Sequence, residues 1–89
     1  MITVDDFTRV NNDVNGNPRY VCHFLDLDLL GAFSGVGISE RYQLALTLAK
    51  QQGGRKFHNK QYGGGIVFSY VYNIQSLCDD LNKLIRAKQ

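Results

Sequence analysis

The sequence predicts an α+β fold: one small domain in which an antiparallel sheet carries two helices packed on one face. Three observations support this prediction. The chain has 89 residues, which suits a single modest core. A hairpin pattern precedes the first helical pattern, and a second pair of strand patterns precedes the last helix, giving a ββαββα-like order. Short elements in this order favour antiparallel layers, and no linker divides residues 1–89.

The first two strands are predicted from "FTRVNNDVNGNPRYVCHFLDL", which begins at Phe7. Asn15-Gly16 tolerates positive φ at both central positions of a turn, so it predicts a type I′ hairpin. Pro18 lacks a backbone donor and suits the start of a strand. Residues 20–25 place apolar side chains on both faces, which predicts a central strand.

The first helix is predicted from "SERYQLALTLAKQQGG", with Ser39 as the N-cap and Gly53 in the left-handed conformation at the C-terminus. Apolar residues recur at helical spacing between these ends. The glycine-interrupted segment 27–37 before the helix is interpreted as an ordered loop that covers the edge of the core. A partner-binding surface is the alternative interpretation of the same loop.

The second strand pair consists of a short strand over 56–58 and a longer one over 66–72, "IVFSYVY". Period-two alternation places Ile66, Phe68, Tyr70 and Tyr72 on one face. Asn73 then caps a last helix, because apolar residues follow it at the spacing of a helix face. They are Ile74, Leu77, Cys78, Leu81, Leu84 and Ile85.

The formal net charge is only +2, but the charges are unevenly distributed. Residues 1–40 hold six acidic and two basic side chains, whereas residues 41–78 hold five basic side chains and no acidic one. Residues 79–89 hold two acidic and three basic side chains. A folded chain with this pattern is expected to present separate positive and negative surfaces.

The stretch "GGRKFHNKQYGGG" (53–65) concentrates glycines, cations and aromatics. It lacks the order of a Walker loop and leads into a strand, so no helix N-terminus faces a phosphate there. Turns and bulges explain the glycines but not the cations. The candidate residues for contact with a partner or a nucleic acid are Arg55, Lys56, Phe57, His58, Lys60 and Tyr62.

Catalytic and metal sites are not expected. Cys22, His23, His58 and Cys78 lack the spacing of a zinc site, and both cysteines suit a core. The chain is therefore predicted not to be an enzyme and to need no metal or cofactor. Asp26 and Asp28 share one side of an extended segment and form a second, acidic candidate patch for a basic partner surface.

Localisation is predicted from what the sequence lacks. No apolar run approaches the roughly 18 residues of a membrane span, and the N-terminal ten residues do not resemble a signal peptide. With two cysteines that form no framework, a reducing bacterial cytoplasm is expected.

Two segments carry a resemblance: "RVNNDVNGNPRYVCHFLDL" and "GGRKFHNKQYGGGIVFSY". They resemble short uncharacterised proteins of bacteriophages and plasmids, in which an N-G-N-P-R hairpin precedes a helix and a G-G-R-K-[YF]…G-G-G-[IF]-V strand. The resemblance covers about two thirds of the chain and implies an accessory protein of a mobile element. It supplies no catalytic residues. By analogy, small polarised domains of this kind, such as anti-CRISPR proteins, block host defence complexes.

The expected function is therefore a non-catalytic binding protein of a mobile element, which inhibits a host defence nucleoprotein complex of the CRISPR type by occluding a surface. The alternative is a small nucleic-acid-binding module that uses the basic loop 53–65. The expected partner is a host protein or nucleoprotein, with no membrane involved. The sequence leaves open whether the chain forms a homodimer.

Overall fold

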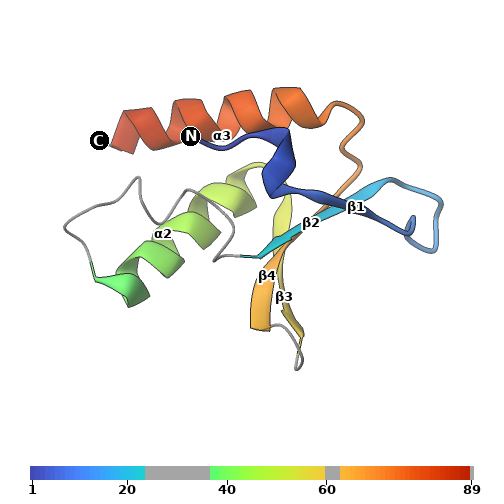
Figure 1. Cartoon of the computed structure of the whole chain (residues 1–89), viewed down its shortest axis with the longest axis horizontal. Coiled ribbons are helices and arrows are strands. Elements are labelled where there is room, and N and C mark those ends of the chain that lie inside the picture. The colour runs from blue at the N-terminus through green and yellow to red at the C-terminus, as the bar shows by residue number, and fades with distance from the viewer. Residues whose placement is uncertain (24–36, 60–62, 89) are drawn as a thin grey trace.

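A four-stranded sheet forms the centre of the computed structural model, which describes residues 1–23, 37–59 and 63–88 (Figure 1). Its strands are β1 (Thr8–Val10), β2 (Arg19–His23), β3 (Gly54–Asn59) and β4 (Gly63–Ser69), in the spatial order β1-β2-β4-β3. The three strand pairings are all antiparallel. A 3₁₀ turn, η1 (Val4–Asp6), precedes β1.

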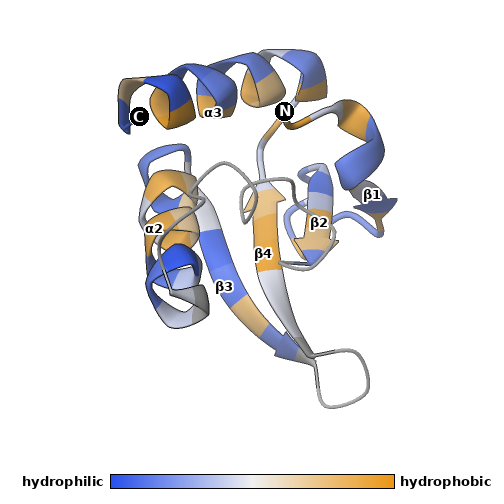
Figure 2. Cartoon of the chain, turned by 60° about the vertical axis from the view of Figure 1, so that its left-hand side comes forward, coloured by the Kyte–Doolittle hydropathy of each residue, from blue (hydrophilic) through white to orange (hydrophobic). Residues whose placement is uncertain are grey.

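Two helices, α2 (Ile38–Gln51) and α3 (Ile74–Lys88), complete the predicted order. Their apolar sides meet the sheet residues Cys22, Ile66 and Phe68 in one core. Figure 2 shows α3 with its hydrophobic residues toward the sheet and its hydrophilic residues outward. The α+β prediction, with both helices on one face of an antiparallel sheet, is confirmed.

The hairpin between β1 and β2 forms, but not through the predicted type I′ turn. A type I′ turn requires positive φ at both of its central residues. Within this hairpin Gly16 has positive φ (82°) but Asn15 does not. The Asp13 carboxylate instead accepts hydrogen bonds from the backbone N–H groups of Asn15 and Asn17, both at 2.9 Å. This side-chain cap favours a longer, non-primed loop between Val10 and Arg19, which are paired in the sheet.

The predicted helix ends are partly correct. Helix α2 is capped by Gly37, not by Ser39, which lies inside the first turn. At the other end Gly53 has φ of 83°, and its N–H donates to Lys50 O at 3.1 Å, as expected for a left-handed C-terminal residue. The Asn73 side chain accepts from Ser76 N at 3.2 Å, which confirms the predicted cap of α3.

The second strand pair differs from its predicted limits. Strand β3 begins at Gly54 and is longer than the expected 56–58. Strand β4 starts at Gly63 and ends at Ser69, so Tyr70 and Tyr72 do not continue its buried face. Tyr70 has φ of 68° and is 61% exposed, and Tyr72 is 81% exposed. The chain leaves the strand at Tyr70, whose positive φ ends the extended conformation, while its N–H still donates to Pro18 O, just before β2.

Candidate functional site

Strand β3 carries four of the predicted contact residues, and its pleat divides them between two faces. Lys56 is paired with Ile66 on β4, and Ile66 is paired with Cys22 on β2. Ile66 and Cys22 both belong to the core. Lys56 and His58 therefore lie on the helix-bearing face, whereas Arg55 and Phe57 lie on the opposite face. Residues adjacent in sequence cannot form one flat patch here, because successive side chains of a strand point to opposite faces.

The face opposite the helices, called here the open face, is built by residues paired across all four strands. They are Thr8, Val10, Arg19, Val21, His23, Arg55, Phe57, Val67 and Ser69. Phe57 contacts His23 edge to face, with ring centroids 5.9 Å apart. The open face thus combines a half-buried apolar centre with the guanidinium of Arg55.

On the other face of β3, Lys56 lies beside helix α2. Its Nζ is 5.3 Å from the centre of the Tyr42 ring, which is within the range of a cation–π contact. His58 is exposed. Gly64 lies near this group, since a Cβ there would stand 3.8 Å from Tyr42 Oη.

The remaining predicted contact residues fall outside the described part of the chain. This applies to Lys60 and Tyr62 of the basic stretch and to the acidic pair Asp26 and Asp28. It applies equally to the predicted loop 27–37 except for its last residue, Gly37.

The cations of the first hairpin take part in the fold. Arg9 Nη2 donates to Asn12 Oδ1 at 2.6 Å, and Arg19 Nε donates to Asn11 O at 2.9 Å. Arg9 also lies over the Tyr20 ring, with 5.4 Å between its Cζ and the ring centre. These contacts hold the hairpin and leave its guanidinium groups less available for a partner.

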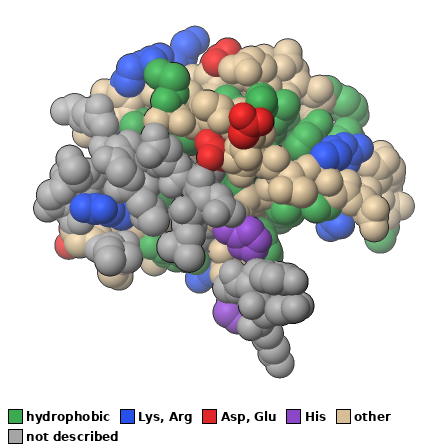
Figure 3. Space-filling view, viewed as in Figure 1, with side chains coloured by type: hydrophobic (Ala, Val, Ile, Leu, Met, Phe, Trp, Pro, Cys, Tyr) green, Lys and Arg blue, Asp and Glu red, His purple; other side chains and the backbone are tan. Residues whose placement is uncertain are grey.

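Arg55 and Lys56 differ from the hairpin cations. Both side chains are exposed, and neither makes an ion pair with a carboxylate of the described residues. Asp6 and Asp13, in the acidic N-terminal part, accept hydrogen bonds from backbone of their own segments instead. In Figure 3 the Lys and Arg side chains lie at separate points of the visible face instead of gathering in one patch.

Both cysteines lie in the core, as predicted. Cys22 Sγ is 3.6 Å from Ile66 O. Burial, with a smaller contribution from the charge of Asp6, raises the pKa of the Cys78 thiol to about 11. Among the residues that the structure describes, no three potential metal ligands lie together.

The glycines around β3 and β4 have a packing role. A Cβ at Gly54 would stand 2.6 Å from the Phe68 ring, and one at Gly65 would collide with Cys22 O and the Phe57 ring. Both positions lie where a side chain from a neighbouring strand fills the space above the backbone. At these two positions the prediction of a turn or bulge is wrong: both glycines lie inside regularly paired strands, and close packing is what requires them.

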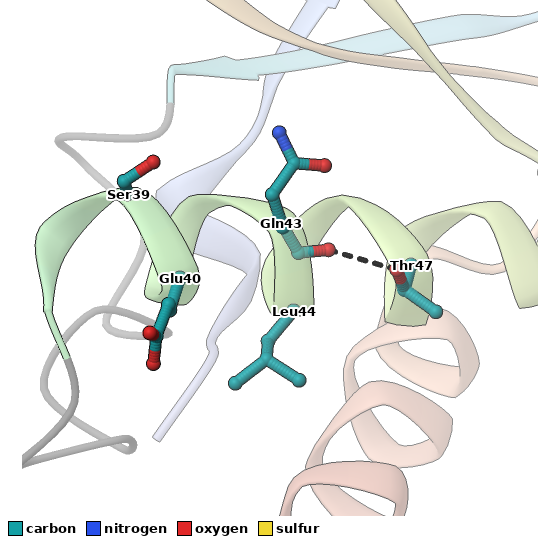
Figure 4. Close-up of a pocket in the computed structure, with 5 residues that line it drawn as sticks. All are labelled: Ser39, Glu40, Gln43, Leu44 and Thr47. Atoms are coloured by element: carbon teal, nitrogen blue, oxygen red, sulfur yellow. Dashed lines mark hydrogen bonds between the residues drawn. The ribbon is translucent and has the colours of Figure 1, made fainter.

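Two surface hollows are formed by described residues. The first lies along the outer side of α2, and Figure 4 shows Ser39, Glu40, Gln43, Leu44 and Thr47 around it. The hydrogen bond drawn between these residues, from Thr47 Oγ1 to Gln43 O at 2.8 Å, lies within the helix. This hollow contains no cation and one carboxylate.

The second hollow was not predicted. It has a volume of about 580 Å³ and lies where β4 ends, between the first hairpin and the junction of α2 with β3. Arg55 is the one predicted contact residue that lines it, together with Asp13 and Tyr70. The sequence predicted Tyr70 as a residue of the strand over 66–72 and not as a contact residue, because the apolar alternation continues past Ser69 without any break.

Neither helix within the described residues is long and apolar enough to cross a membrane. Comparison with curated proteins and with solved structures gave no significant match. Residues 3–88 match a protein family described as "Staphylococcus phage terminal repeat-encoded protein TreK". This match confirms the expected likeness to small bacteriophage proteins and extends over nearly the whole chain. The chain therefore belongs to the TreK family of Staphylococcus phage terminal repeat-encoded proteins.

Proposed function

We propose that this phage protein is a non-catalytic binding protein that inhibits a host nucleoprotein complex, of the CRISPR type or a related defence system, by occluding one of its surfaces. Its partner is a staphylococcal protein or nucleoprotein in the cytoplasm of the infected cell. Arg55 and Lys56, which flank the edge strand β3 on its two faces, provide the contact from either side of that edge, and the other predicted residues of the stretch 53–65 extend it.

One observation carries this proposal: Arg55 and Lys56 are exposed on an edge strand and form no ion pair with a described carboxylate. The Arg55 guanidinium has no hydrogen-bond partner among the described residues and Lys56 lies over the Tyr42 ring, whereas the hairpin holds Arg9 and Arg19 through hydrogen bonds. An edge strand also presents unpaired backbone groups, which a partner can approach. Arginine near a half-buried aromatic side chain, as at Arg55 and Phe57, is typical of residues that contribute strongly to protein interfaces.

The test is affinity capture from a staphylococcal lysate, with identification of what the wild-type protein retains. The double variant Arg55→Glu/Lys56→Glu should retain at least tenfold less of the same partner while its melting temperature stays within about 2 °C. Lys83→Glu with Arg86→Glu, on the exposed side of α3, is the matched charge control. Equal retention by both variants, or unfolding of the β3 variant, would contradict the proposal.

A second candidate is direct binding of single-stranded nucleic acid. It is favoured by the arrangement of Arg55 and Phe57 on one open face, since cations contact phosphates and aromatic rings stack on bases. Titration with labelled single- and double-stranded DNA and RNA at 50 and 200 mM salt tests this candidate. Binding that weakens steeply with salt would support it, and absence of binding at the lower salt would remove it.

A further inference from the structure

The hollow at the end of β4 has a composition that the fold does not explain. It lies on the open face, because Arg55, Val67 and Ser69 point to that side of the sheet. Val67 and Val71 supply an apolar part, Tyr70 lines it with an aromatic side chain, and Arg55 brings a cation. It therefore combines a charged donor, an apolar wall and an exposed ring within one concave site of about 580 Å³.

Tyr70 is the strained member of this site. It is the one non-glycine residue with positive φ among the residues that the structure describes. A side chain is disfavoured in this region, and such strain persists where surrounding contacts or a function maintain it. The backbone is held by the hydrogen bond from Tyr70 N to Pro18 O at 3.0 Å.

The Tyr70 ring does not compensate for this strain. The residue is 61% exposed, and its side chain makes no hydrogen bond or ring contact with another described residue. Glycine would satisfy the backbone at this position more easily than tyrosine. The ring is thus available for contact with another molecule at the rim of the hollow.

The two charges in the hollow differ in their availability. Asp13 already accepts three hydrogen bonds within its own turn, from Asn15 N, Asn17 N and Asn17 Nδ2. Arg55 has no such partner among the described residues. A ligand with an isolated negative charge can pair with the guanidinium while it stays clear of Asp13.

We propose that this hollow binds an acidic side chain of the partner protein, with Arg55 donating two hydrogen bonds to its carboxylate and Tyr70 packing against its methylene groups. Val67 and Val71 form the apolar surface on which that side chain rests. The inference rests on the proposed function, because it names the chemistry by which a protein partner is recognised. Arginine suits this role, because its planar group pairs with both oxygens of a carboxylate.

Asp13 favours a protein over a nucleic acid as the occupant. The Asp13 carboxyl is ionised at neutral pH, as an aspartate ordinarily is, and hydrogen bonds from Asn17 lower its pKa further. A nucleic acid carries a phosphate at every nucleotide, so its neighbouring phosphates would meet this negative charge. A protein segment with a single glutamate meets less of that repulsion, because it brings one negative charge and no neighbouring ones.

The experiment is a titration of the ¹⁵N-labelled protein, followed by NMR, with an acetylated and amidated hexapeptide that contains one glutamate. The matched probes are the same peptide with glutamine and a six-nucleotide oligothymidylate. The glutamate peptide should shift the Arg55 Nε–Hε signal and the Tyr70 amide, and the glutamine peptide should bind at least fivefold more weakly. No response to the glutamate peptide, or stronger binding of the oligothymidylate at the same signals, overturns the inference.

Variants give an independent readout. Tyr70→Gly should weaken peptide binding at least threefold without lowering the melting temperature, since it relieves the strained backbone. Tyr72→Gly is the control, because Tyr72 is exposed nearby but does not line the hollow. Equal binding by both variants overturns the inference. If wild type and Tyr70→Gly retain the lysate partner equally, the inference about the hollow is overturned but the proposed function stands. If no partner is retained while the peptide binds at the hollow, the inference stands but the proposed function is overturned.

Discussion

The side-chain amide of Asn82 forms two hydrogen bonds with the backbone of Ile2, eighty positions earlier in the chain. Ile2 N donates to Asn82 Oδ1 and Asn82 Nδ2 donates to Ile2 O, both at 2.9 Å. The buried side chain of Ile2 joins the core beside α3 as a result. One amide thus fixes the N-terminal segment to the last helix.

Replacing Asn82 by alanine should lower the free energy of unfolding by about 1–2 kcal/mol, because both hydrogen bonds are lost. Urea denaturation monitored by circular dichroism measures this change. Lys83→Ala, at the neighbouring exposed position, is the control and should change stability by less than about 0.5 kcal/mol. Equal stability of the two variants would show that the amide pair does not stabilise the fold.

The adjacent glycines 64 and 65 should respond very differently to alanine. A methyl group at Gly65 would collide with Cys22 O and the Phe57 ring, so Gly65→Ala should cost about 3 kcal/mol or more. At Gly64 the nearest atom to a Cβ is Phe57 O at 3.3 Å, and a small shift relieves that contact. Gly64→Ala should therefore stay within about 1 kcal/mol of wild type. Thermal unfolding of both variants tests the difference, and similar effects would contradict it.

The buried thiol of Cys78 should make stability fall at alkaline pH. Its pKa in the folded protein is raised from 9.0 to about 11, so the folded state favours the protonated thiol. This contribution is present below the unfolded pKa and is lost as pH rises from about 9 toward 11, at no more than about 1.4 kcal/mol per pH unit. Chemical denaturation between pH 8 and 10.5 should show a steeper decline for wild type than for Cys78→Ala. Parallel curves would exclude this source of pH dependence.

Thiol labelling gives a second test of the same burial. Cys22 and Cys78 are both buried, so the native protein should react with a thiol reagent at pH 8 far more slowly than the protein in 8 M urea. Single variants Cys22→Ala and Cys78→Ala assign the remaining reaction to one thiol. Fast labelling of the native Cys22→Ala variant would show that Cys78 is accessible.

Acid should weaken the first hairpin through Asp13. Its pKa is lowered, first by the hydrogen bond from Asn17 N, so the stabilisation is present above the ordinary value of 3.8 and is lost as pH falls through the folded pKa. The Asp13→Asn variant keeps an acceptor oxygen but has no carboxyl to titrate. Melting temperatures between pH 5 and pH 2 should therefore fall more for wild type than for Asp13→Asn, and the reverse order would refute the assignment.

The sequence by itself determined the class of fold and most of its elements. Alternation within 66–69, the apolar spacing of α2 and α3, the capping by Asn73 and the left-handed Gly53 all depend on interactions between near neighbours. Such local rules can be read directly from the chain. The concentration of cations in residues 41–78 was equally visible, because charge is a property of composition.

The tertiary structure alone decided which residues share a surface. The pleat of β3 separates Arg55 from Lys56, and the pairing of β2 with β4 brings the first hairpin close to the end of β4. The candidate site at Tyr70 exists because the chain leaves the strand there with positive φ while the Tyr70 N–H still donates to Pro18 O of the first hairpin. That contact joins residues 52 positions apart, so no local pattern around Tyr70 could reveal it.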